Sequence, residues 1–238
     1  MLRTLLLLLF FIGSVSFSFS QRDSLNDVIR NTSDHETLMV TYLAVSDIFF
    51  HVEPDSCQFY YEKAYSYAKK MKNGFNIAAI ENGIGLCEMD KENYEDALVW
   101  FKKALLGLMN VQEERASLMV MNNIGASYSE LQQPIKALPY LLKAQAYAEN
   151  IDDMPLLMLA ELNLGNVYED LNQTDLAAEY YLTSRSRTTL EEDPYNFALN
   201  TYNIGCIMLR GDIMNDSTLL VLKEAFQIAT DNQYYNLA

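Results

Sequence analysis

The chain has few of the residues on which turns and many catalytic or metal sites depend. Among 238 residues there are five prolines, nine glycines, three cysteines, two histidines and one tryptophan. So few prolines and glycines disfavour an all-β protein, which needs many tight turns. Basic residues are scarce too, with 17 Lys and Arg against 32 Asp and Glu, a net charge of −15. A nucleic-acid groove needs clustered positive charge, so we expect no nucleic-acid partner.

Residue patterns for catalysis are also missing. Neither His35 nor His51 has a second ligand at metal spacing, so we predict no zinc site. No G-x-S-x-G or Walker sequence occurs, and Gly83-Ile84-Gly85 lacks the third glycine of a dinucleotide loop. The acidic clusters at 152–153 and 191–193 are interpreted as solvated charge at linkers, although paired carboxylates can act as acid and base. The sequence therefore predicts no enzyme, no metal and no cofactor.

The first twenty residues have the layout of a secretory signal peptide. A positive start at Arg3 precedes the apolar run 5–12, and Ser18 and Ser20 place small residues before Gln21. An uncleaved membrane anchor is the alternative, but the run is shorter than the roughly 20 residues that span a bilayer. We predict a signal peptide at 1–20 and a mature segment at 21–238 that does not insert into a membrane. The expected location is periplasmic or otherwise extracytoplasmic.

Export makes the cysteines informative. Cys57, Cys87 and Cys206 show no C-x-x-C spacing, and an odd number cannot form a complete disulfide framework. We interpret them as small buried residues in helix packing. Pairing between two of them in an oxidising compartment stays open.

A regular repeat runs through the chain. Glycines recur at positions 85, 125, 165 and 205, a constant step of forty, and small residues follow twelve and nineteen positions later. The position sixteen residues after each glycine is aromatic or leucine: Phe101, Leu141, Tyr181 and, with one inserted residue near Gly211-Asp212, Leu222. An earlier unit has Val45 in place of the glycine. The five predicted units are about 38–77, 78–117, 118–157, 158–197 and 198–237.

Each unit reads as a pair of helices. Apolar residues recur at three- and four-residue spacing within each half, and breaks fall near 91–93, 132–134, 172–174 and 211–212. The glycine would let the two helices approach closely. Because one hairpin cannot bury both faces, neighbouring units must stack.

This pattern resembles the tetratricopeptide repeat family. The likeness is clearest in the third unit, which carries Ile124-Gly125, Tyr128, Ala137 and Ala144. The resemblance implies an all-α fold, a right-handed superhelical solenoid of antiparallel helix hairpins, of an exported bacterial type. The period exceeds the one typical of the family, about 34 residues, and this excess predicts longer helices. HEAT and armadillo arrays have periods of about 40 residues, but they lack the Gly-x-x-Tyr and paired-alanine pattern.

Asparagines mark the candidate site. Asn123, Asn163 and Asn203 lie two residues before the glycine in three successive units. The resemblance places this position in a concave groove, where some members use asparagines to hold a ligand's backbone. Three neighbours complete the predicted ligand-binding set: Asn82, Asn122 and Asn166. The alternative is that these amides tie helices together, because buried polar groups need partners.

The sequence thus predicts a non-enzymatic interaction scaffold for a protein or peptide. Its groove would be fringed by acidic side chains, which favours a neutral or basic partner: Asp90, Glu130, Glu169 and Asp170. The alternative, implied by the resemblance, is the extracytoplasmic sensory region of a membrane-bound signalling receptor or transcriptional regulator. Under either reading we expect the array to continue beyond residue 238, and a membrane tether would lie there.

Overall fold

The computed structural model describes residues 19–210 and 216–232, and all regular structure in these ranges is helical. The predicted signal peptide lies almost wholly outside the described residues, as do the break near 211–212 and the chain after residue 232. The helices are α2 (Phe19–Asn31), α3 (His35–Phe49), α4 (Pro54–Met71), α5 (Gly74–Asp90), α6 (Tyr94–Asn110), α7 (Glu114–Glu130), α8 (Pro134–Asn150), α9 (Met154–Asp170), α10 (Thr174–Ser186), α11 (Pro194–Arg210) and α12 (Asp216–Asp231).

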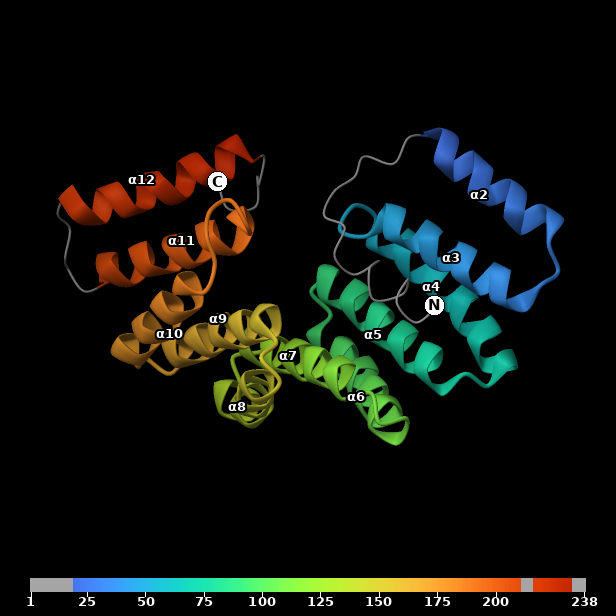
Figure 1. Cartoon of the computed structure of the whole chain (residues 1–238), viewed down its shortest axis with the longest axis horizontal. Helices are drawn as coiled ribbons and strands as arrows, with labels where there is room; N and C mark the ends of the chain where they lie inside the picture. Colours follow the sequence, from blue (N-terminus) through green and yellow to red (C-terminus); the bar gives the residue numbers. More distant parts are fainter. Residues whose placement is uncertain (1–18, 211–215, 233–238) are drawn as a thin grey trace.

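From α3 onward the helices pair into five antiparallel hairpins, α3–α4, α5–α6, α7–α8, α9–α10 and α11–α12. We call the first member of each pair a first helix and the other a second helix. The hairpins follow one another along an arch, with α2 near one end and α12 near the other (Figure 1). The predicted all-α, right-handed superhelical solenoid of hairpins is confirmed.

The repeat period has a simple structural basis. Helices α5 to α9 are each 17 residues long, and a turn of constant length separates each from the next. One helix with its turn therefore takes half of the period, and the longer helices predicted from the period are confirmed. Each turn holds one non-glycine residue in the left-handed region, with φ between 53° and 61°: Lys72, Glu92, Gln112, Gln132, Asp152 and Asn172.

These turns end the helices in the same way. At the end of α5, the Asn93 N–H donates to the Glu88 carbonyl at 2.9 Å, and the Glu92 N–H donates to the Met89 carbonyl at 2.8 Å. This is a Schellman cap, which satisfies carbonyls that a helix end leaves unpaired. Glycine is the usual residue at this left-handed position. Other residues occupy it in these turns, so the low glycine content is compatible with many regular turns.

The repeating glycines are required by close packing inside each hairpin. A Cβ atom at Gly125 would lie 2.4 Å from Leu141 Cδ2, and one at Gly165 would lie 2.4 Å from Tyr181 Cε1. Gly205 meets Leu222 in the same way, at 2.5 Å, which supports the predicted one-residue insertion in the last unit. The residue sixteen positions after Gly85, Gly125 and Gly165, or seventeen positions after Gly205, therefore lies directly over the glycine.

The first hairpin has no glycine at the position where the later hairpins need one for close packing. Val45 occupies the glycine position there and is fully buried. The Tyr61 ring instead lies over the next hairpin, where a Cβ atom at Gly83 would come within 2.5 Å of Tyr61 Cε1. This contact explains why residue 83 is glycine, whereas the equivalent positions of the next three units carry asparagine.

The fourth hairpin departs from the regular pattern. Helix α10 ends at Ser186 and is only 13 residues long, and the segment 187–193 forms an irregular connection to α11. Arg187 opens this connection, and its guanidinium donates to both carboxylate oxygens of Glu161 on α9, at 2.6 and 2.7 Å. Glu161 is only 1% exposed, so the early end of α10 supplies a buried carboxylate with its counter-ion.

Candidate functional site

The first helices of the second, third and fourth hairpins form the inner layer of the arch. Helix α5 contacts α7 and α7 contacts α9, whereas no comparable contact joins second helices of neighbouring described hairpins. In a curved stack, the layer whose successive members touch lies on the inside of the curve. Helices α5, α7 and α9 therefore line the inner wall, and α11 joins them through the hydrogen bond between Asn203 and Asn166.

Asn123 and Asn82 form an amide pair between two hairpins. The Asn123 side-chain NH₂ donates to Asn82 Oδ1 at 2.9 Å, which joins α7 to α5. Asn123 remains partly exposed, whereas Asn82 is 6% exposed. The hydrogen bond from Asn123 to Asn82 thus orients the Asn123 side chain, while the Asn82 side chain itself is buried.

A second pair joins α11 to α9. The Asn203 NH₂ donates to Asn166 Oδ1 at 3.5 Å, a long hydrogen bond. The hydroxyl of Tyr181 also donates to Asn166 Oδ1, at 2.7 Å, and contacts Glu169 Oε2 at 2.9 Å. From the sequence alone, Tyr181 is interpreted only as a packing residue. The overlooked signal is that tyrosine, unlike Phe101 or Leu141 at the same place, carries a hydroxyl that needs a polar partner.

Asn163 and Asn122 have different surroundings from the two amide pairs. Asn163 on α9 is partly exposed, and its amide makes no hydrogen bond to any described residue. Asn122 is fully buried and donates to the Leu118 carbonyl at 3.3 Å, while its Oδ1 is left without a partner in the described structure. Of the six predicted ligand-binding residues, four are therefore accessible: Asn123, Asn163, Asn166 and Asn203. We call Asn123, Asn163 and Asn203 the amide row.

The acidic side chains predicted to fringe the groove lie at the carboxyl ends of first helices. All four have polar partners. Asp90 lies 2.8 Å from His51 Nδ1, Glu169 contacts Tyr181, and Asp170 accepts from the Ser129 hydroxyl. Glu130 is exposed and pairs with the Tyr94 hydroxyl. These carboxylates keep the inner wall negative at one end.

The chemistry available on the inner wall is hydrogen bonding. An asparagine amide offers two N–H donors and a carbonyl acceptor, and it does not change charge with pH. Among the described residues no group of three His, Cys, Asp or Glu side chains could hold a metal ion. Burial raises the pKa of Asp47 to about 6, but this carboxyl lies on α3 in the first hairpin, away from the amide row.

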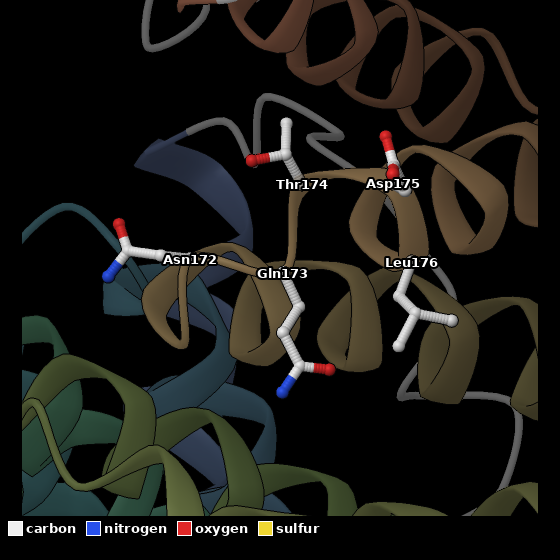
Figure 2. A pocket seen from close by; sticks show the side chains of 5 residues that line it. All are labelled: Asn172, Gln173, Thr174, Asp175 and Leu176. Carbon is white, nitrogen blue, oxygen red and sulfur yellow. The ribbon is translucent and has the colours of Figure 1, made fainter.

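A shallow depression lies elsewhere, at the turn between α9 and α10. Its lining is the contiguous segment 172–176, and Figure 2 shows these five side chains diverging from the turn rather than converging on a common point. A ligand site needs convergent polar groups, so we assign no ligand to this depression. Within the described ranges, every helix is too short or too polar to traverse a bilayer.

Comparison with protein families agrees with this architecture. The model described as tetratricopeptide repeat matches residues 76–149 and, in an overlapping window, residues 114–189. These windows together run from α5 to the end of α10, and so include Asn82, Asn122, Asn123, Asn163 and Asn166. No curated protein matches the chain significantly.

Solved structures resemble the fold at low sequence identity. The apo form of RapI is 19% identical, with a TM-score of 0.75, covering 89% of this chain and 75% of RapI. NprR in complex with its cognate peptide NprX is 16% identical, with a TM-score of 0.73, covering 91% of this chain and 63% of NprR. BtubC from P. vanneervenii is 15% identical, with a TM-score of 0.72 and 91% of each chain covered.

Proposed function

Since the chain belongs to the tetratricopeptide repeat family, we propose that it is a non-enzymatic scaffold whose inner wall binds a protein segment or peptide through the amide row. The observation that carries the proposal is Asn163. Its amide is partly exposed and makes no hydrogen bond to a described residue, although it lies in register between two asparagines that are held in place. An amide in this setting is available to a ligand at no cost in internal hydrogen bonds.

The chemistry of the row fits the main chain of an extended segment. Such a segment presents N–H donors and carbonyl acceptors whatever its side chains are, and an amide side chain can pair with either. Asn123 is oriented by Asn82, and Asn166, beside the row, is oriented by Tyr181. Pre-oriented groups reduce the entropy lost on binding. The acidic fringe favours a neutral or basic segment.

The comparisons support a peptide as the ligand. NprR, which shares the fold, has been solved with its cognate peptide bound. Helical repeat grooves in general accept extended segments or helices. For this chain the extended segment fits better, because main-chain groups of a helix are already paired and would leave the amide row without partners.

We also propose that the protein works outside the cytoplasm, on the basis of the signal-peptide pattern of residues 1–20. The extracytoplasmic part of a signalling receptor is one form that this location would take. Mass analysis of the N-terminus of the protein isolated from the expressing cell tests the location. A terminus at Gln21 supports export, and an intact Met1 in the cytosolic fraction contradicts it.

Peptide selection tests the binding proposal. A random linear peptide library displayed on phage is panned against the immobilised protein, and enriched peptides are measured by fluorescence anisotropy against the wild type and Asn163→Ala. We expect Asn163→Ala to weaken binding about tenfold, the equivalent of one or two hydrogen bonds. Its stability should stay within about 0.5 kcal/mol of the wild type, because no internal bond is lost.

A matched control is Asn150→Ala, which removes an exposed amide from the end of the second helix α8 and should leave binding unchanged. Asn123→Ala should weaken both binding and folding, since it also deprives Asn82 of its partner. Peptides that bind Asn163→Ala as tightly as the wild type would refute the role of the amide row.

A further inference from the structure

Two cysteines from consecutive hairpins meet in the core. Cys57 on α4 and Cys87 on α5 are both 0% exposed, and their Sγ atoms are 2.9 Å apart. They lie within one buried cluster with Tyr61, Ala64 and Ile84. From the sequence alone, pairing between two cysteines in an oxidising compartment stays open. The fold brings Cys57 and Cys87 together by placing one on each side of the junction between the first and second hairpins.

The repeat shows that sulfur is not required by packing at these places. Cys57 lies twelve residues after the glycine position of the first unit, and Cys87 lies two residues after the glycine of the second unit. The equivalent pairs at the next three junctions are Ala97 and Ser127, Ala137 and Val167, and Ala177 and Ile207. The non-sulfur side chains at these positions are also buried. A cysteine at both positions therefore occurs only at the first of these four junctions.

We propose that Cys57 and Cys87 form a disulfide bond that ties the first hairpin to the second. A disulfide has a sulfur–sulfur distance of about 2.05 Å, so small rotations of the two side chains close the present 2.9 Å. Cys206 lies on α11 in the fifth hairpin and is the thiol left over from an odd number.

The bond forms by thiol–disulfide exchange with a low-molecular-weight disulfide such as glutathione disulfide. One cysteine thiolate attacks the glutathione disulfide and releases one glutathione thiolate. The second cysteine then attacks the mixed disulfide and releases the other. The protein loses two protons and two electrons, and one glutathione disulfide becomes two glutathione thiols.

The buried setting determines when the bond forms and how long it lasts. The hydrogen bond to Cys87 and burial together raise the pKa of Cys57, so the reactive thiolate is disfavoured once the hairpins have closed. Exchange therefore takes place during folding, while the thiols are still accessible. The same burial then keeps reductants away from the finished bond.

Refolding in a glutathione buffer tests the proposal. The reduced, unfolded full-length chain is refolded with glutathione and glutathione disulfide, quenched with acid, alkylated in denaturant and analysed by intact mass and peptide mapping. We expect one alkylated thiol, at Cys206, and a linked pair of peptides containing Cys57 and Cys87. The oxidised protein should melt about 7–15 °C above the reduced one, as estimated for a cross-link that closes a loop of about 30 residues.

Two variants provide controls that the repeat itself suggests. Cys57→Ala and Cys87→Ser copy the residues found at other junctions, so they should fold, carry no disulfide and melt at the same temperature with or without oxidant. Cys206→Ala should behave like the wild type. Three alkylated thiols in the refolded wild type, or a bond that involves Cys206, would overturn the proposal.

Discussion

An alanine at Gly125 probes the contact that sets the distance between the two helices of a hairpin. The added Cβ would lie 2.4 Å from Leu141 Cδ2 and 2.5 Å from Leu141 Cγ, closer than real carbon atoms approach. Leu141 is fully buried, so it cannot move aside freely. Overpacking of this kind costs about 1–3 kcal/mol. Against it stands a gain of about 1 kcal/mol, because alanine favours a helix more than glycine does.

In a chain that also carries Leu141→Ala, we expect Gly125→Ala to increase stability rather than decrease it. In the background Leu141→Ala, the side chain that blocks the new methyl group is absent, so Gly125→Ala keeps only the helix-propensity gain. We expect Gly125→Ala to destabilise the wild type by up to about 2 kcal/mol and to stabilise the Leu141→Ala background by up to about 1 kcal/mol. The coupling between the two positions is then about 1–3 kcal/mol.

Urea unfolding followed by far-UV circular dichroism measures all four proteins of this cycle. Differences in the transition midpoint at an unchanged slope report differences in stability. Retained helical signal in Gly125→Ala at zero urea confirms that the fold persists. Equal effects of Gly125→Ala in both backgrounds would refute the argument that Leu141 is the reason for the glycine.

Three further predictions concern the turns and the buried charges. Gln132→Gly should stabilise the chain by about 1 kcal/mol, because φ is 55° at this residue and glycine adopts this conformation without strain. The control Lys143→Gly, within α8, should destabilise the chain by about 1 kcal/mol. The midpoints of urea unfolding measure both effects. Burial raises the pKa of Asp47 to about 6, so between about pH 4 and about pH 6 the native state binds a proton that the unfolded state has lost. The free energy of unfolding should therefore fall by about 2–3 kcal/mol as pH rises from about 4 to about 6. Thermal melts over this pH range should show the fall in the wild type and not in Asp47→Asn. Arg187→Ala should cost about 2–4 kcal/mol by leaving Glu161 buried without its counter-ion, and calorimetry should show less loss when Glu161→Gln accompanies it.

The repeat could be predicted from sequence because its physical cause is local and recurs. The glycine and the large residue that follows it belong to one hairpin, so their spacing is sixteen residues in three units, with one inserted residue in the last, and is visible in the chain. The turn residues were harder to recognise. Glu92, Gln132 and Asn172 share a left-handed conformation, but they have no common side chain that would reveal it.

Contacts between hairpins could not be predicted in the same way. Asn123 and Asn82 lie in different hairpins, and Tyr61 reaches across a junction to Gly83. Such contacts depend on how far each hairpin rotates relative to the next, which the repeat period does not specify. For the same reason, the sequence pattern did not separate the accessible Asn163 from the buried Asn122.

The most direct test of the proposed function is whether Asn163 contacts a bound peptide. In ¹⁵N-labelled protein, the side-chain NH₂ signals of Asn163 and Asn150 are assigned by single substitution and followed while a peptide from the selection is added. We predict that the Asn163 signals shift with the affinity measured by anisotropy, that the Asn150 signals do not move, and that N-methylation of the peptide backbone weakens the shift. Saturation of the protein with peptide while the Asn163 signals stay in place, with shifts confined to the second helices, would contradict a binding role for the amide row.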